Sequence, residues 1–533
     1  IDSIIEVLDT TLRDGAQTLG VTFSLQDKIS IAERLDQLGF DFIEGGFSGS
    51  NPKDNKFFKA SQKLNMRHSK IVSFGSTRRK NINSQDDVSL SQLLDTKTET
   101  VVLFGKSWGL HVKNVLNTTF EENLNMIFDS IKHLRSHERE VIFDAEHYFD
   151  GYKSDPDYAI KTLKIAEKAG ARALVLCDTN GGTLTHDIGC ITEKTVAAIN
   201  SMVGVHCHND AGVAVANTLS AVKAGASHIQ GTINGFGERC GNADLCQVIP
   251  SLKYKMNLDI LGNDKTSKEN LKELTSLSKY VYELTNIPPK PHQPYVGSGA
   301  FSHKAGMHVN AILKHSSAYE HINPEVVGNK RKFLVSELSG KSGIIRVAKD
   351  LGFDITDRTD VAEKVMVQVK KLESEGYHLE NADATLSLII LKELNQNIEP
   401  FKIRRWKVSI IKEKTMKVIA EVTVEVNGKN YHEFGEGIGP VHSLDIAIRK
   451  ALVCRFSDLD KVRLVNYKVT VVDSVGGTAS PVRVFIEFRE DGLRWAATSV
   501  SGNITEASKR ALIDGYTYWL LTHSPQKLGW NLK

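Results

Sequence analysis

Eight short apolar runs alternate with longer amphipathic stretches over the first 240 or so residues, and this alternation constrains the fold more than any other feature. Each apolar run predicts a strand, and the predicted strands are 5–9, 40–46, 71–75, 100–105, 141–146, 173–178, 203–208 and 228–234. Strands that alternate with helices favour a parallel sheet with right-handed crossovers. Eight such units in about 250 residues predict a closed (β/α)8 TIM barrel, with a doubly wound open sheet as the alternative.

The first predicted helix shows how the intervening stretches are bounded. It begins after Ser24, and Asp27 stands three residues on as the partner in a capping box. Its apolar positions repeat with a helical period and are Leu25, Ile29, Ala32, Leu35 and Leu38. Gly39 then ends the helix, since glycine readily adopts the left-handed conformation of a C-terminal cap.

Beyond the predicted barrel the pattern changes twice. A polar helical stretch over 263–286 leads into the proline-rich segment 288–294, and short helices are predicted over 336–376. From about residue 383, strand patterns at 418–426 and 482–488 are each followed by a turn and a helix. We therefore predict a barrel over 1–262, a helical linker region over 263–382 and a C-terminal α+β domain over 383–533.

The C-terminal domain carries the signs of an internal duplication. Ala447, Ala451 and Leu452 in its first predicted helix match three residues in its second at a constant offset of 60, namely Ala507, Ala511 and Leu512. Such self-similarity at a fixed spacing is typical of a repeated structural unit.

Composition excludes several classes of protein. The formal charge of +3 is too close to balance for a nucleic-acid-binding chain. No apolar stretch reaches the ~18 residues that cross a membrane. The six cysteines form no C-x-x-C pair, which is typical of the reduced thiols of an intracellular protein. We expect a cytoplasmic protein that acts on small molecules.

Polar residues follow six of the predicted strands, at the end where each apolar run stops. They are Arg13 and Asp14, Glu44, Glu146, Asp178 to Asn180, His206 and His208, and Glu238, Arg239 and Asn242. In a barrel the carboxyl ends of all strands converge on one face, where the active site lies. This placement favours the barrel over the open sheet.

The sharpest metal signal is His206-Cys207-His208. Side chains at alternate positions of a strand point the same way, so both histidines can hold one ion while Cys207 packs behind them. Asp14 and Asn242 are further candidate ligands from neighbouring strand ends. Two nitrogens and two oxygens suit Zn²⁺, Mn²⁺ or Mg²⁺ and leave positions open for a substrate.

Three more residues are candidates for the chemistry. Arg13 either pairs with Glu44 or Asp14 or donates to an oxygen that becomes anionic in the transition state. Thr179 either caps the chain locally or binds a substrate carboxylate. Glu146 is an acid beside a proposed cation and can orient other groups or transfer a proton.

Four segments carry a resemblance to a known family. The segments Leu12–Thr18, His206–Asp210, Gly235–Ala243 and Phe301–His308 resemble motifs of the 2-isopropylmalate, homocitrate and citramalate synthases, and the tail resembles their duplicated regulatory domain. The segments 74–79, 104–108 and 144–152 are most similar to the citramalate synthase group. In some of these enzymes an aromatic residue two before the site glutamate shapes the pyruvate pocket, whereas this chain has Asp144.

The resemblance implies roles for individual residues. Asp14, His206, His208 and Asn242 match the metal site, and Glu146 matches a site glutamate. Arg13, Gln17 and Thr179 match substrate-binding positions, with Arg13 also stabilising the oxyanion. His308 and Tyr319 match linker residues implicated in taking a proton from the acetyl methyl group. In relatives these linker residues can reach the barrel of the partner subunit, which implies a homodimer.

The resemblance also implies a reaction. Acetyl-CoA condenses with a 2-oxo acid, assisted by a divalent metal ion; with pyruvate the product is citramalate, a precursor of isoleucine, and an amino-acid effector is expected at the tail. The alternatives are a 2-isopropylmalate synthase that uses 2-oxoisovalerate, a metal-dependent lyase of the aldol type, and a metal-binding sensor without catalysis. A lyase does not usually carry so long a duplicated tail.

Overall fold

The computed structural model describes residues 4–47, 49, 51–262, 268–285, 287–304, 306–334, 340–394, 399–412, 416–473, 476–491 and 493–523. The chain forms two compact units. The first comprises residues 1–301 and 322–330, and the second comprises 302–321 and 331–533. No helix within the described ranges combines the length and apolar character that a membrane crossing requires.

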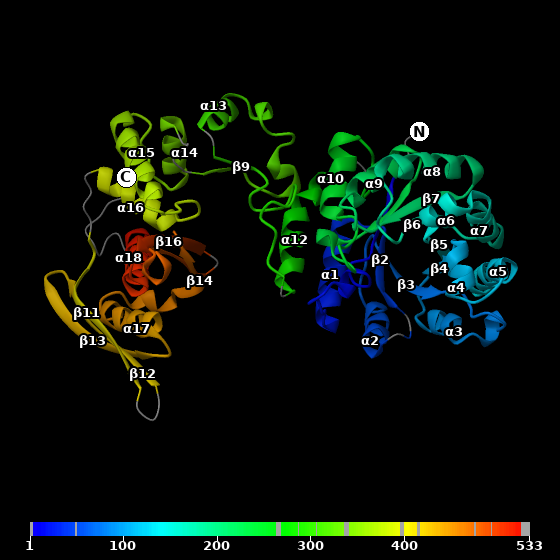
Figure 1. The fold of residues 1–533 in the computed structure, drawn as a ribbon, viewed down its shortest axis with the longest axis horizontal. Helices are drawn as coiled ribbons and strands as arrows, with labels where there is room; N and C mark the ends of the chain where they lie inside the picture. Colours follow the sequence, from blue (N-terminus) through cyan, green and yellow to red (C-terminus); the bar gives the residue numbers. More distant parts are fainter. Residues whose placement is uncertain are drawn as a thin grey trace. The chain divides into compact units, whose positions relative to one another are not determined.

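The first unit is a closed barrel of eight parallel strands in the order β1 to β8, with β8 pairing back to β1 (Figure 1). The strands are β1 (Glu6–Asp9), β2 (Phe42–Phe47), β3 (Lys70–Ser76), β4 (Thr100–Lys106), β5 (Glu140–Glu146), β6 (Ala173–Asp178), β7 (Met202–Cys207) and β8 (His228–Gly231). All eight predicted strands are confirmed, and the open sheet is excluded. β8 ends earlier than predicted, because a 3-10 turn at Ile233–Gly235 places Asn234 at a φ of 64°.

Helices surround the barrel, and most of them connect its successive strands. They are α1 (Leu25–Leu38), α2 (Pro52–Ser61), α3 (Val88–Asp95), α4 (Gly109–Asn114), α5 (Phe120–Ser136), α6 (Tyr148–Ser154), α7 (Pro156–Ala169), α8 (Thr185–Ala198), α9 (Ala214–Lys223), α10 (Leu245–Lys255) and α12 (Leu274–Glu283), with 3-10 turns at Gly15–Gln17, Ser84–Asp86, Leu271–Glu273 and Pro324–Val327. The predicted capping box of α1 is confirmed, and Gly39 closes the helix at a φ of 90°. Part of the predicted helical stretch, 263–267 and 286, lies outside the described residues.

The start of the second unit holds helices of the predicted linker region and the first helix of the predicted C-terminal domain. They are α13 (Gly306–Lys314), α14 (Lys341–Asp350), α15 (Thr359–Ser374) and α16 (Asp383–Glu393), with a 3-10 turn at Ser316–Ala318. A short parallel pair that the sequence did not predict joins β9 (Ser302–His303) to β10 (Lys332–Phe333). The predicted start of the short helices, 336–339, lies outside the described residues.

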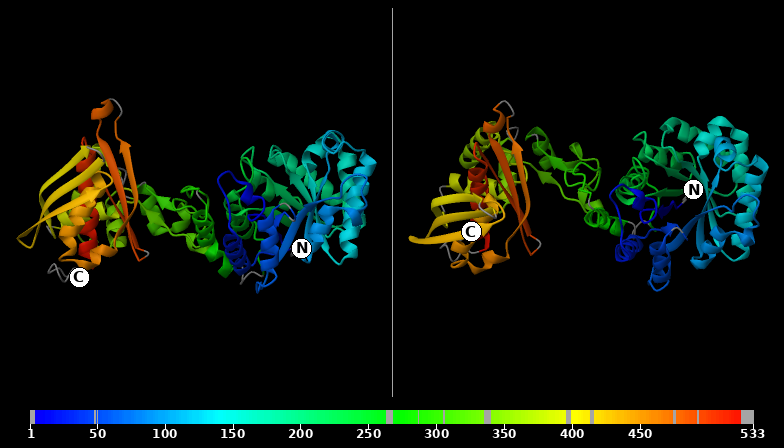
Figure 2. Two further views of the ribbon diagram at one scale, coloured as in Figure 1. Left: turned by 90° about the horizontal axis from the view of Figure 1, so that it is seen from below. Right: turned by 60° about the horizontal axis from the view of Figure 1, so that its bottom comes forward.

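The C-terminal part of the second unit confirms the duplication. One repeat is the antiparallel sheet β11 (Lys402–Lys412), β12 (Met416–Val426) and β13 (Lys429–Gly437), followed by α17 (Pro440–Val453). The other is β14 (Arg463–Val471), β15 (Val482–Glu490) and β16 (Leu493–Ser501), followed by α18 (Ile504–His523), with 3-10 turns at Ser457–Lys461 and Gly477–Ala479. Figure 2 shows the two helices between the two sheets. The three matched pairs of Ala and Leu residues are fully buried in one shared core.

Candidate metal centre and active site

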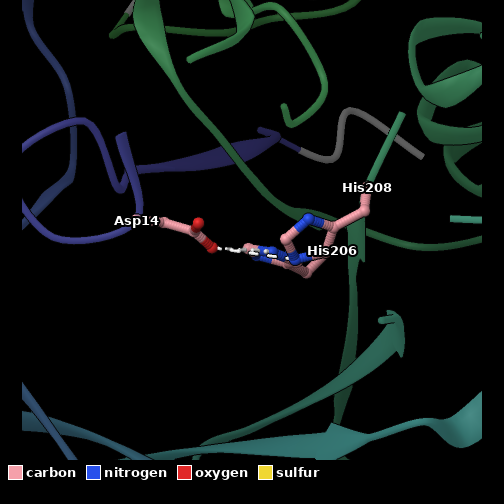
Figure 3. Close-up of side chains that lie close together, drawn as sticks. All are labelled: Asp14, His206 and His208. Carbon is pink, nitrogen blue, oxygen red and sulfur yellow. Dashed lines mark ion pairs between the residues drawn. The ribbon is translucent and has the colours of Figure 1, made fainter. Parts of the chain in front are cut away.

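Three side chains converge at the carboxyl end of the barrel. Asp14 follows β1, His206 lies near the end of β7, and His208 lies one residue beyond that strand. Figure 3 shows both imidazoles turned toward the same carboxylate. The Nε2 atoms of His206 and His208 lie 3.5 and 3.8 Å from Asp14 Oδ2. The three side chains are buried, and their ligand atoms lie within 4.8 Å of one another, so they can share one cation.

Asn242 stands beside this group because of backbone pairing. It forms an antiparallel bridge with His208, and the adjoining hydrogen bonds from Asn209 N to Gly241 O and from Ala243 N to Cys207 O measure 2.9 Å each. Its side-chain nitrogen donates to Phe236 O, whereas its Oδ1 is buried with no partner among the described residues. Asp14 Oδ1 is likewise buried and unpartnered within the described part of the chain. Oxygen atoms left in this state fit a site that binds a hard cation.

The charge states of Asp14 and His208 also fit metal binding. Burial opposes ionisation of Asp14, but the Arg13 charge and the two imidazoles outweigh it and hold the pKa of Asp14 well below its usual range. Burial, together with the His206 charge, lowers the pKa of His208 to about 4. At neutral pH the site therefore offers an ionised carboxylate and a neutral imidazole, which are the forms that bind divalent ions.

Arg13 is fixed beside the candidate ligands. Its Nε donates to Glu44 Oε2 at 2.7 Å and its Nη1 to Asp14 Oδ2 at 3.2 Å. Its guanidinium carbon also lies 3.9 Å from the centre of the Phe74 ring. The Nη2 group forms no hydrogen bond to any residue that the structure describes. The ion-pair reading from the sequence is therefore confirmed. Arg13 also keeps Nη2 as a donor, and its role toward a transition-state oxygen stays a prediction.

A cavity of about 410 Å³ opens at this end of the barrel and is lined by both metal-site and substrate-site candidates, including Gln17, Glu146 and Thr179. The backbone N–H of His147 donates to Thr179 Oγ1 at 2.9 Å, which leaves the hydroxyl hydrogen of Thr179 for another acceptor. Glu146 forms an ion pair with Lys106. Gln17 is exposed at the end of the 3-10 turn that follows Asp14.

Aromatic rings form one wall of the cavity. Phe74 and Phe104 stack with their ring centres 5.1 Å apart, and Phe47 meets Phe74 edge to face at 5.5 Å. All three line the cavity, together with Arg13. The side of the cavity next to the Arg13 guanidinium is therefore aromatic and apolar.

The linker candidates lie together in the second unit. The rings of His308 and Tyr319 stack with centres 4.0 Å apart, and both side chains are exposed. The neighbouring Glu320 is buried, and it accepts a hydrogen bond from Arg331 Nε at 2.7 Å and pairs with His303 Nε2 at 3.1 Å. Glu320 thus anchors the segment that presents the stacked pair.

Sequence reasoning offered Glu44 as the partner of Arg13 but missed the contacts of three further polar residues of this site. Glu44 fixes Arg13, Lys106 pairs with Glu146, and Gln230 and Asp144 form hydrogen bonds inside the barrel. Burial raises the pKa of Asp144 to about 7 despite the nearby His206 charge. Their signal in the sequence is a polar side chain within an apolar strand run, which is costly unless the group is hydrogen-bonded.

Family models match the chain in three successive segments. The HMGL-like family matches residues 4–281, the homocitrate synthase post-HMGL domain-like family matches residues 295–377, and the LeuA allosteric (dimerisation) domain matches residues 380–520. The segments follow the order of barrel, linker region and duplicated tail.

Individual relatives match over almost the whole length. The (R)-citramalate synthase of Sulfolobus acidocaldarius is 47% identical over 97% of both chains. That of Aquifex aeolicus is 46% identical over 97% of this chain and 98% of its own. The 2-isopropylmalate synthase of Methanocaldococcus jannaschii is 31% identical over 96% of this chain and 94% of its own.

Proposed function

Because this chain belongs to the family of the (R)-citramalate synthases, we propose that it condenses acetyl-CoA with pyruvate to give (R)-citramalate and CoA. A proton leaves the acetyl methyl group, the methyl carbon bonds to the keto carbon of pyruvate, and water cleaves the thioester. The observation that carries the proposal is the buried group Asp14, His206 and His208 next to Arg13, in a chain that matches these synthases end to end.

Different residues of the barrel have different roles in this proposal. We assign Asp14, His206, His208 and Asn242 to a divalent ion, Mg²⁺, Mn²⁺ or Zn²⁺, which when bound supplies Lewis-acid polarisation of the keto group. Arg13, held by Glu44, donates to the keto oxygen as it becomes an alkoxide. Thr179 donates its free hydroxyl hydrogen to the pyruvate carboxylate, and Gln17 contacts the substrate at the mouth of the cavity. Glu146, paired with Lys106, orients groups around the acetyl donor.

The acetyl methyl proton is assigned to the linker. We propose that His308 and Tyr319, stacked on each other, remove it, and that residues 263–382 thereby complete an active site whose main part lies within 1–262. In this proposal the catalytic base comes from the region that follows the barrel, and the metal ligands come from the barrel itself.

The choice of pyruvate over a larger 2-oxo acid follows from the aromatic wall. Phe47, Phe74 and Phe104 stand beside Arg13, so a methyl group fits where an isopropyl group meets the rings. Overpacking of this kind typically costs about 1–3 kcal/mol, which corresponds to roughly a 5- to 150-fold preference.

A panel of 2-oxo acids tests the proposal. Acetyl-CoA and Mn²⁺ are mixed with pyruvate, 2-oxobutyrate or 2-oxoisovalerate, and CoA release is followed with a thiol reagent. We expect the highest kcat/KM with pyruvate. A higher value with 2-oxoisovalerate would replace the assignment by 2-isopropylmalate synthase, and cleavage of the product without acetyl-CoA condensation would indicate a lyase.

For the tail, residues 383–533, we propose a homodimer interface and a site for isoleucine as inhibitor. An effector acts only if it binds a less active conformation more tightly. A coupling of about 1–3 kcal/mol changes apparent substrate affinity about 5- to 150-fold. Gly435 and Gly437 bring β13 against Ser443 of α17, where a Cβ would lie within 3 Å of the helix backbone. These two glycines therefore serve packing.

Gly439 is the better probe of the effector site, because a Cβ there meets nothing within 4 Å. We expect isoleucine to inhibit at subsaturating pyruvate, leucine to inhibit less, and Gly439→Ala to relieve inhibition without loss of activity. Inhibition by leucine alone would favour the isopropylmalate alternative, and no response to either amino acid would leave the tail as a dimerisation module.

A further inference from the structure

Gln230 links a candidate metal ligand to a buried acid. It lies in β8, fully buried, and pairs across the sheet with His206 of β7. Its Oε1 lies 2.9 Å from His206 Nδ1, and its Nε2 donates to Asp144 Oδ1 at 2.9 Å. Asp144 lies in β5, so the chain of hydrogen bonds crosses the interior of the barrel.

The direction of each hydrogen bond in this chain follows from the groups at its ends. The Asp144 oxygen accepts, so the amide NH2 of Gln230 faces Asp144 and the amide oxygen faces His206. A carbonyl oxygen can only accept, so when His206 is in the neutral form that binds a metal, its imidazole proton must be on Nδ1. His206 Nε2 then carries a bare lone pair, and it is this atom that lies 3.5 Å from Asp14 Oδ2.

His208 lacks such support. Its Nδ1 is buried with no partner among the described residues, so nothing in that part of the chain selects its tautomer from that side. The two histidines of the candidate centre therefore differ, and the interior of the barrel fixes only His206.

We propose that Asp144 and Gln230 are positioning residues that hold His206 in its Nδ1-protonated tautomer and so set the affinity of the barrel for its divalent ion. Partners that orient a ligating histidine in this way typically change metal affinity about 10- to 100-fold when removed. The proposal rests on the metal site described under the proposed function. It also gives Asp144 a role in a position where some citramalate synthases have an aromatic residue.

Three variants of similar shape test the chain of hydrogen bonds. Gln230→Met keeps the volume but removes the acceptor for His206. Asp144→Asn replaces the carboxyl group by an amide that can either accept or donate, so the Gln230 amide is free to turn. The double variant D144N/Q230E reverses the direction of the hydrogen bond between positions 144 and 230. The amide introduced at position 144 donates to the carboxylate introduced at position 230, and that carboxylate still accepts from His206 Nδ1. Side-chain volume is nearly the same in all three, so the variants differ in the hydrogen bonds and the carboxyl group that they leave beside His206 and not in packing.

The readout is the dissociation constant of Mn²⁺ measured by calorimetry on the metal-free full chain, with kcat at saturating Mn²⁺ as a second measurement. We expect about 10- to 100-fold weaker binding in Gln230→Met, a smaller loss in Asp144→Asn, and recovery to within about threefold of the wild type in D144N/Q230E. The matched control is Gln293→Met, since Gln293 is also buried and its Nε2 donates to an aspartate, Asp244 Oδ2, at 2.8 Å. Among the described residues, Gln293 forms no hydrogen bond to a candidate metal ligand. Gln293→Met should bind Mn²⁺ like the wild type.

The outcomes separate the two proposals. If the wild type binds no Mn²⁺, the metal site itself is wrong. His206→Ala serves as the control that should lose Mn²⁺ binding. If it does, but folded Gln230→Met binds Mn²⁺ within about threefold of the wild type, the positioning role is wrong, because a lost orienting partner should weaken binding about 10- to 100-fold. A folded double variant that binds as weakly as Gln230→Met also overturns it. If the double variant does not fold, the two single variants decide the question.

Discussion

Both ends of the barrel hold charged side chains that are at least partly buried, but these side chains are paired at one end and partly unpaired at the other. At the amino end, Glu6 accepts hydrogen bonds from both Nη groups of Arg172 and pairs with His228 Nδ1 at 3.3 Å. At the carboxyl end, buried polar atoms remain without partners among the described residues: Asp14 Oδ1, Glu44 Oε1, Asp178 Oδ1, His208 Nδ1 and Asn242 Oδ1. In the Glu6 cluster, of the atoms that the structure describes, only His228 Nε2 is in that state. A buried polar group is costly when unpaired, so the carboxyl end is built for something that binds there.

Equivalent histidines at the two ends should respond differently to the same substitution. We expect His208→Ala to lower kcat by about 10³-fold or more, because a Lewis acid contributes several kcal/mol. His228→Ala, in the Glu6 cluster, should keep most of its kcat and lose thermal stability. Steady-state assays at saturating Mn²⁺ with melting curves distinguish the two. Full activity in His208→Ala would contradict a catalytic metal centre at the carboxyl end of the barrel.

Substitution of His308 tests whether residues outside the barrel take part in catalysis. Loss of a proton-transfer group typically costs about 10²–10⁴-fold in rate, so His308→Ala should lower kcat by that amount with little change in the KM for pyruvate. His315→Ala is the matched control, because His315 is also exposed and follows the same helix. A drop below about threefold in His308→Ala would confine the chemistry to the barrel.

Substitution of one glutamate at each end of the barrel gives the smallest expected effect, a change in stability at one end and in kcat at the other. Burial alone would raise the pKa of Glu6, but hydrogen bonds from Arg172 and His228 and their charges outweigh it and lower the pKa from 4.5 to about 2. A carboxylate whose pKa falls on folding stabilises the protein above its unfolded pKa. That contribution is therefore complete above about pH 4.5 and is lost as the pH falls toward 2.

Glu6→Gln should thus cost about 1–3 kcal/mol of unfolding free energy at pH 7, and less near pH 3, with kcat unchanged. Denaturant titrations at the two pH values measure the difference. Glu44→Gln, the same substitution at the other end, should instead lower kcat by loosening Arg13. Equal stability losses for Glu6→Gln at both pH values would contradict the assignment of the ion pair.

The sequence predicts the barrel well and the interior of the site poorly, for a physical reason. Apolar runs report burial on both faces of a parallel strand, so β1 to β8 were visible, and so were polar residues at their ends. The hydrogen bonds of Gln230 join β5, β7 and β8 across the barrel, and such contacts arise only when the sheet closes.

The tail was predicted only in part for a related reason. β12 alternates buried and half-buried residues and was found, whereas β11 and β14 are mostly exposed and carry many charged or polar residues. Both strands do place apolar residues at alternate positions, for example Val465, Tyr467, Val469 and Val471 in β14. Charged and polar residues between them leave no continuous apolar run like those that marked the barrel strands. The repeat was still detectable, because α17 and α18 bury their matched alanines and leucines in one core.

The most direct test of the difference between the two ends is the stoichiometry of Mn²⁺ binding. Metal-free protein is titrated with Mn²⁺, and free ion is followed by electron paramagnetic resonance, for the wild type, His208→Ala and His228→Ala. We predict one tightly bound Mn²⁺ per chain in the wild type and in His228→Ala, and no tight site in His208→Ala. Unchanged binding in a folded His208→Ala variant would contradict the assignment of the carboxyl end as the metal centre.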